Sequence, residues 1–82
     1  MAATQNDIRR WLNEAKNKDA KYLIVVCDSW DYEDYPVYCM DSEECLDRYN
    51  NPGDMQRVME VYDMEMDIET QLNQNRVFNL PK

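Results

Sequence analysis

The sequence predicts a small α+β domain in which helices pack on a three-stranded sheet. An amphipathic helical stripe opens the chain, and a run of six apolar residues then indicates a buried strand. Strand and helix patterns alternate after that, so the expected order is α-β-β-α-β-α. Because 82 residues are too few for two independent cores, we expect residues 1–82 to form a single domain.

The first helix is indicated by its cap and by its apolar spacing. Thr4 is the expected N-cap, and Asp7 in the first turn suits the positive end of a helix dipole. Apolar side chains then recur at i, i+3, i+4 and i+7, at Ile8, Trp11, Leu12 and Ala15. The helix should end near residues 17–19, where Asn and charged residues replace the stripe.

Two strands are expected next. Residues 22–27 are apolar in succession, which is typical of a strand buried on both faces in the centre of a sheet. Residues 35–40 indicate a second strand, and Pro36 places it at an edge because proline has no N–H for the ladder. The acidic stretch 28–34 joins the two strands.

The second half of the chain adds two helices and a strand. Asp41 or Ser42 caps a helix that ends at residues 50–54, which include the only glycine. Residues 55–64 alternate imperfectly and indicate a third strand, and Asp67 is the expected cap of a last helix. Residues 76–82 either dock as a tail or fray.

The connections predict a topology. The first two strands should be antiparallel, whereas a right-handed crossover through the second helix should make the second and third strands parallel. The apolar first strand fits best between them, which gives a mixed sheet of spatial order 2-1-3. The second face of that sheet then needs a cover, either the last helix or another copy of the protein. Six methionines, which fill irregular contacts, suit a homodimer or ordinary core packing.

Composition excludes several functions. The chain has 17 acidic residues against nine basic ones, a formal charge of -8, and no histidine. The usual proton shuttle at pH 7 and the commonest metal ligand are therefore missing. No P-loop, dinucleotide fingerprint or nucleophile elbow occurs, so we expect no enzyme activity, no catalytic residues and no cofactor. Direct nucleic-acid binding is disfavoured by the acidic balance.

No apolar run approaches the ~20 residues of a membrane span, and the start lacks the features of a signal peptide.

The three cysteines, Cys27, Cys39 and Cys45, are odd in number and show no C-x-x-C spacing. They fit reduced, buried structural thiols better than a disulfide scaffold, and without histidine they fit a zinc site poorly. We therefore expect no metal site and a cytoplasmic location.

One acidic-aromatic stretch stands out as a candidate partner-binding site. Its residues are Asp28, Trp30, Asp31, Tyr32, Glu33, Asp34 and Tyr35. Aromatic side chains flanked by charge are typical of a protein-interface hot spot within a polar rim. The alternatives are a solvated hairpin connection whose rings pack back on the sheet, and a cation site, although the EF-hand pattern is absent.

A second set of acids indicates a tentative acidic surface, at Glu43, Glu44, Asp47, Asp63, Glu65 and Asp67. Carboxylates spread over a small rigid domain can imitate a phosphate array and occupy a nucleic-acid channel on another protein. The alternative is that they only keep the surface soluble.

Several segments carry a resemblance to known proteins: residues 25–28, 31–38, 55–62 and 71–73, and the pair Trp11-Leu12. In these segments the chain resembles small uncharacterised acidic proteins of tailed bacteriophages and prophages. The resemblance implies a bacterial host cytoplasm. The hypothesis is a non-enzymatic phage accessory protein that binds a host or phage protein, such as an acidic inhibitor of a nucleic-acid-binding or anti-phage defence factor.

Two other functions stay open. One is a binder of a small ligand, such as a nucleotide signal, at a homodimer interface. An anionic ligand would need basic residues gathered in one pocket, drawn from Arg9, Arg10, Lys16, Lys18 and Lys21. The other is a structural subunit of a phage assembly.

Overall fold

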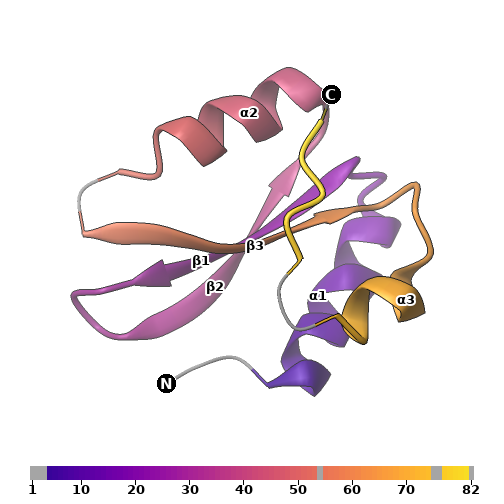
Figure 1. The fold of residues 1–82 in the computed structure, drawn as a ribbon, viewed down its shortest axis with the longest axis horizontal. Helices are drawn as coiled ribbons and strands as arrows, with labels where there is room; N and C mark the ends of the chain where they lie inside the picture. Colours follow the sequence, from indigo (N-terminus) through magenta and orange to yellow (C-terminus); the bar gives the residue numbers. More distant parts are fainter. Residues whose placement is uncertain (1–3, 54, 75–76, 82) are drawn as a thin grey trace.

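The computed structural model describes residues 4–53, 55–74 and 77–81, and its elements follow the predicted order (Figure 1). They are α1 (Gln5–Asn17), β1 (Tyr22–Asp28), β2 (Glu33–Cys39), α2 (Ser42–Asn50), β3 (Gln56–Asp63) and α3 (Ile68–Leu72). The α+β class and the order α-β-β-α-β-α are confirmed. Asp54, Arg76 and Lys82, which the sequence assigned to a turn and a tail, lie outside the described residues.

The helix caps are those that the sequence indicates. Thr4 and Asp7 form a reciprocal capping box at α1, and Asp67 accepts the Thr70 N–H at the start of α3. At α2 the cap is Asp41, whose side chain accepts the Glu44 N–H at 2.8 Å. Ser42 is therefore the first helical residue.

Strand β1 lies between β2 and β3, as predicted. Tyr22 pairs with Cys39 on one side and with Asp63 on the other, and both pairings are antiparallel. Strands β2 and β3 therefore run parallel to each other, but they are not neighbours because β1 separates them. The prediction of a mixed sheet is wrong for that reason, and the sheet is antiparallel throughout.

Strand β2 begins two residues earlier than predicted, so Glu33 and Asp34 belong to it and the connection shrinks to residues 29–32. The edge position of β2 is confirmed. The backbone N–H and C=O of Val61 in β3 are both bonded to residues 77–79, so they point away from β1. The backbone N–H and C=O of Ile24, which lies opposite Val61, therefore point away from β3 and toward Val37 of β2. Because these groups alternate in direction along a strand, the nitrogen of Pro36 points outward from the sheet, where the proline ring hinders addition of another strand.

Helices α1 and α3 cover one face of the sheet (Figure 1). Leu23, Val25 and Tyr62 of the sheet are buried there in one cluster with helix residues Ile8, Trp11, Leu12 and Leu72. Side chains of this size each stabilise a fold by about 1.5–3 kcal/mol when fully buried. This cluster holds Ile8, Trp11 and Leu12 of the predicted apolar stripe of α1, and Ala15, the fourth residue of the stripe, is also buried.

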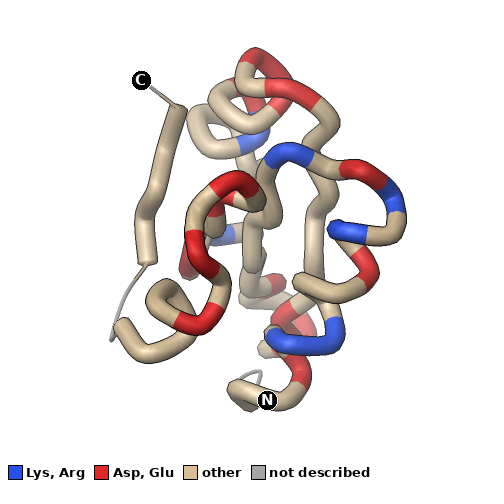
Figure 2. Tube along the Cα trace, turned by 90° about the vertical axis from the view of Figure 1, so that its right-hand side faces the viewer, with Lys and Arg blue, Asp and Glu red and all other residues tan. Residues whose placement is uncertain are grey.

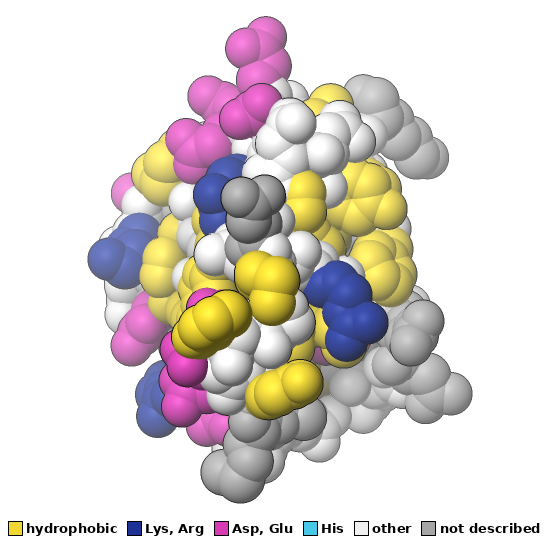
Figure 3. All heavy atoms as spheres, turned by 90° about the vertical axis from the view of Figure 1, so that its left-hand side faces the viewer, with side chains coloured by type: hydrophobic (Ala, Val, Ile, Leu, Met, Phe, Trp, Pro, Cys, Tyr) yellow, Lys and Arg dark blue, Asp and Glu magenta, His cyan; other side chains and the backbone are white. Residues whose placement is uncertain are grey.

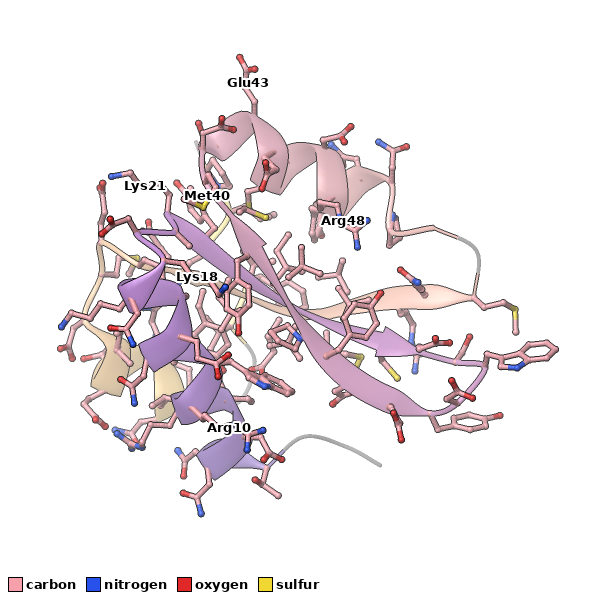
Figure 4. The ribbon with its side chains drawn as sticks, turned by 180° about the vertical axis from the view of Figure 1, so that it is seen from behind. Arg10, Lys18, Lys21, Met40, Glu43 and Arg48 are labelled. Atoms are coloured by element: carbon pink, nitrogen blue, oxygen red, sulfur yellow. The ribbon has the colours of Figure 1, made fainter. Side chains whose placement is uncertain are left out.

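Helix α2 covers the other face, across the sheet from α1 and α3. Ile24, Val26 and Val61 are buried there with Cys39 and Cys45, and Tyr49 and Leu80 pack at the margin. Figure 4 shows the Arg48 side chain extending from α2 toward the sheet. The last helix, α3, lies on the opposite face of the sheet, so α2 and the C-terminal segment cover this face instead. This face therefore gives no reason to expect a second copy of the protein as its cover.

The C-terminal segment docks rather than frays over its described residues. Phe78 forms a parallel bridge with Val61, and Val77 is fully buried in the first cluster. The buried side chain of Gln71 joins the segment to the rest of the fold. Its Oε1 accepts from the Asp63 N–H at 2.9 Å and from Asn79 Nδ2 at 2.7 Å, and its Nε2 donates to the Asp63 carbonyl at 2.9 Å.

Candidate functional site

The turn between β1 and β2 is held by three hydrogen bonds. The Trp30 N–H donates to Asp28 Oδ1 at 2.9 Å, which closes an Asx-type turn after the strand. The Ser29 N–H and its Oγ both donate to the carbonyl of Met55, each at 2.7 Å. The turn is thus attached to the residue that precedes β3, and the two loops form one unit.

This unit exposes three large apolar side chains: Trp30 is 74%, Tyr32 72% and Met55 53% exposed. We call it the hairpin end. Figure 3 faces this side of the molecule and shows hydrophobic side chains gathered there, with charged side chains around them. An isolated exposed apolar residue is ordinary, but three on adjoining turns form a patch of the kind that marks interaction sites.

The backbone at the hairpin end is also unusual. Tyr32 and Met55 have φ angles of 56° and 62°, in the left-handed region that glycine adopts most easily. A side chain in that region costs about 1–3 kcal/mol, and such residues cluster at functional sites. Both strained positions carry exposed apolar side chains.

The structure separates the seven residues of the acidic-aromatic stretch. Trp30, Asp31, Tyr32 and Glu33 are exposed at the hairpin end, and Asp28 holds the turn. Asp34 is half-buried on the α1 face, where it pairs with Cys27 across the strands; burial, and after it the neighbouring Asp34, raises the pKa of that thiol. Tyr35 is half-buried and packs against the cluster under α2.

The sequence does not indicate Met55 as a member of this site, because the contact between Met55 and Ser29 depends on how β3 pairs with β1.

The six residues of the predicted acidic surface form two groups. Glu43, Glu44 and Asp47 lie on α2, whereas Asp63, Glu65 and Asp67 lie at the end of β3 and in the turn before α3. Figure 2 shows acidic positions on both segments.

Several of these carboxylates already serve the fold. Glu44 accepts the Met40 N–H at 3.2 Å, and Asp63 accepts the Glu65 N–H at 2.9 Å. Hydrogen bonds from Thr70 lower the pKa of Asp67 below its usual value. The carboxylates are distributed over α2 and over the end of the molecule opposite the hairpin.

Metal-ligand groups and thiols are the next features among the described residues, and the cysteines lie mainly inside the fold. No group of three or more Cys, Asp or Glu among them is placed to hold a metal ion. Cys39 and Cys45 are fully buried in the same cluster under α2. Burial raises the pKa of Cys39 to about 12 and that of Cys45 to about 11, so little reactive thiolate exists at neutral pH.

Within the described ranges, no helix has the length and apolar character needed to cross a membrane. Comparison with known proteins finds no match to this chain among family models, curated proteins or solved structures.

Proposed function

We propose that this chain is a non-enzymatic accessory protein that binds another protein through its hairpin end. The observation that carries the proposal is the exposure of Trp30 and Tyr32 on a turn fixed by Ser29 and Asp28. Tryptophan and tyrosine dominate protein-interface hot spots, and a rigid turn loses little conformational entropy on binding.

The local chemistry of the patch supports a role beyond folding. Neither Trp30 nor Tyr32 contributes to either buried cluster. Tyr32 and Met55 occupy backbone positions where glycine or asparagine would be less strained. A requirement for large side chains at these positions accounts for this choice of residues.

The partner that fits best is basic. Asp31 and Glu33 flank the exposed rings, and the chain as a whole carries a charge of -8, which favours encounter with a positive surface. A nucleic-acid-binding or anti-phage defence factor in a bacterial host presents such a surface. The resemblance to small acidic phage and prophage proteins supports this choice, and we propose that the protein acts there as an inhibitor in the host cytoplasm.

The alternative of an anionic ligand bound at a homodimer interface has less support. Arg9 pairs with Glu69, and Lys18 lies 5.4 Å from the centre of the Tyr38 ring. Lys16 and Lys21 do line one depression, but four acidic residues line it with them. No observation specifically favours a structural subunit.

The test is affinity capture from a bacterial lysate, compared between the wild-type protein and the double variant Trp30→Ala/Tyr32→Ala. Quantitative mass spectrometry should show a specific partner whose recovery falls by at least tenfold with the variant. Its melting temperature should stay close to that of the wild type because both rings are exposed. The control, Leu46→Ala, removes an exposed apolar side chain from α2 and should leave capture unchanged. Equal capture by wild type and double variant would contradict the proposal.

A further inference from the structure

A second surface lies at the end of the molecule opposite the hairpin end. Two depressions meet there, of about 430 Å³ and 280 Å³. The larger lies between the C-terminal end of α1 and the segment that leads into α3, and the smaller lies between the start of β1 and the start of α2. Lys21 and Glu65 line both of them and form an ion pair of 3.9 Å. We call this surface the methionine end, after Met40, Met64 and Met66.

Methionine side chains supply much of the apolar lining. Met64 and Met66 line the larger depression with Ala20 and Ile68, and Met40 lines the smaller one with Tyr22. Met40 is 48% and Met66 46% exposed. Exposed methionines adapt their shape to varied apolar side chains, which is why they recur on peptide-binding surfaces. Lys21 and Met40 lie together at this end in Figure 4.

The charge of the methionine end is strongly negative. Its described lining residues include two lysines, Lys16 and Lys21. The acids that line the same depressions are Asp19, Asp41, Asp63, Glu65, Asp67 and Glu69. Figure 2 faces this end and shows acidic positions along the segment that leads into α3. An apolar floor with an acidic rim attracts a positive, amphipathic partner and repels an acidic one.

We infer that the methionine end binds a basic amphipathic segment of another protein, with one large apolar side chain in each depression and Lys or Arg facing the acidic rim. A second copy of this chain is a poor occupant because its own charge is -8. The site is separate from the hairpin end, since the strands run from one end to the other. This inference therefore does not rest on the proposed function, and one molecule has room for both partners.

The test uses a synthetic probe and methionine methyl signals. The probe is a helical peptide of about 18 residues, five turns, with leucine on one face and lysine on the other. In protein carrying ¹³C-methyl methionine, the peptide should shift the signals of Met40, Met64 and Met66. The signals of Met55 and Met59, which lie on the loop and strand toward the hairpin end, are internal controls and should stay in place.

Two control peptides separate the contributions of charge and apolar contact. A peptide with glutamate in place of lysine should not bind, and one with serine in place of leucine should bind at least tenfold more weakly. In the protein, Met40→Gln/Met66→Gln should weaken binding about tenfold, the effect of losing about 1.4 kcal/mol. Met55→Gln should not weaken it. Glu65→Gln should weaken binding more than Asp31→Asn, which removes a charge from the hairpin end.

Three results would overturn the inference. They are the absence of any methyl shift at saturating peptide, shifts at Met55 as large as those at Met66, and equal binding of the leucine and serine peptides. The last would show attraction by charge alone. None of these results would contradict capture through Trp30 and Tyr32, and large shifts at Met55 would place the basic peptide at the hairpin end instead.

Discussion

Ser29 gives both of its hydrogen-bond donors to one acceptor, the backbone carbonyl of Met55, at 2.7 Å each. The two residues are 26 positions apart in the chain. Their contact joins the β1–β2 turn to the start of β3 and brings Met55 to the same end as Trp30 and Tyr32. The exposed patch is therefore a product of sheet pairing and not of one loop.

Replacing Ser29 by alanine should loosen this patch. The Ser29 N–H bond remains, but the hydroxyl bond is lost, which should lower the free energy of unfolding by about 0.5–1.5 kcal/mol in urea titrations. Backbone amide exchange should become faster at residues 29–32. Ser42→Ala is the matched control, because Asp41 caps α2 and Ser42 is exposed there. Unchanged exchange in Ser29→Ala would show that the hydroxyl bond does not hold the turn.

Met55→Asn should stabilise the fold while weakening partner capture. Asparagine tolerates the left-handed backbone of position 55 better than methionine, so we expect a gain of about 0.5–1 kcal/mol in unfolding free energy. Met66→Asn, at an exposed position without a positive φ, should give no such gain. Urea denaturation of both variants decides the point, and an equal response would mean that strain at position 55 is negligible.

Gln71→Leu should destabilise the protein and release the C-terminal segment. The buried amide satisfies the N–H and C=O of Asp63 and accepts from Asn79, so removing it leaves polar groups without partners, at a cost of about 2 kcal/mol. The signal of Asn79 should move toward its random-coil position in NMR spectra. Gln74→Leu, at an exposed residue, is the control. A neutral Gln71→Leu would show that apolar packing and the backbone hydrogen bonds to Val61 hold the segment without the amide.

The cysteines should differ in reactivity toward iodoacetamide. The thiolate is the reactive species, so a raised pKa of about 12 at Cys39 and about 11 at Cys45, together with full burial, should protect both in the native state. Cys27 is only half-buried and should be alkylated first. All three should react in guanidinium chloride, as peptide mapping by mass spectrometry can show. Alkylation of Cys39 as fast as Cys27 would contradict the native burial.

The sequence was sufficient for the elements that repeat a local pattern. The spacing of Ile8, Trp11 and Leu12 fixes the buried side of α1, and the unbroken apolar run of β1 requires a central strand with cover on both faces. Pro36 similarly restricts β2 to an edge. These features depend on periodicity and on the missing N–H of proline, which are properties of the residues themselves.

Relationships between distant segments could not be predicted from such patterns. Helix α2 buries fully only Cys45, so its short apolar face gave little sign that it covers the second face of the sheet. The predicted start of β2 differs from the observed one because Glu33 and Asp34 are charged residues typical of loops, whereas pairing with β1 holds them extended. Met55 became part of the candidate site only through Ser29.

Site-specific photocrosslinking tests the central claim most directly. With p-benzoylphenylalanine in place of Trp30, irradiation in a bacterial lysate should yield a covalent adduct with the partner that the wild-type protein captures. The same group in place of Leu46 on α2 should yield no such adduct. Crosslinking from position 30 alone would support the hairpin end as the binding surface. Crosslinking from position 46 alone, or from neither position despite capture, would contradict it.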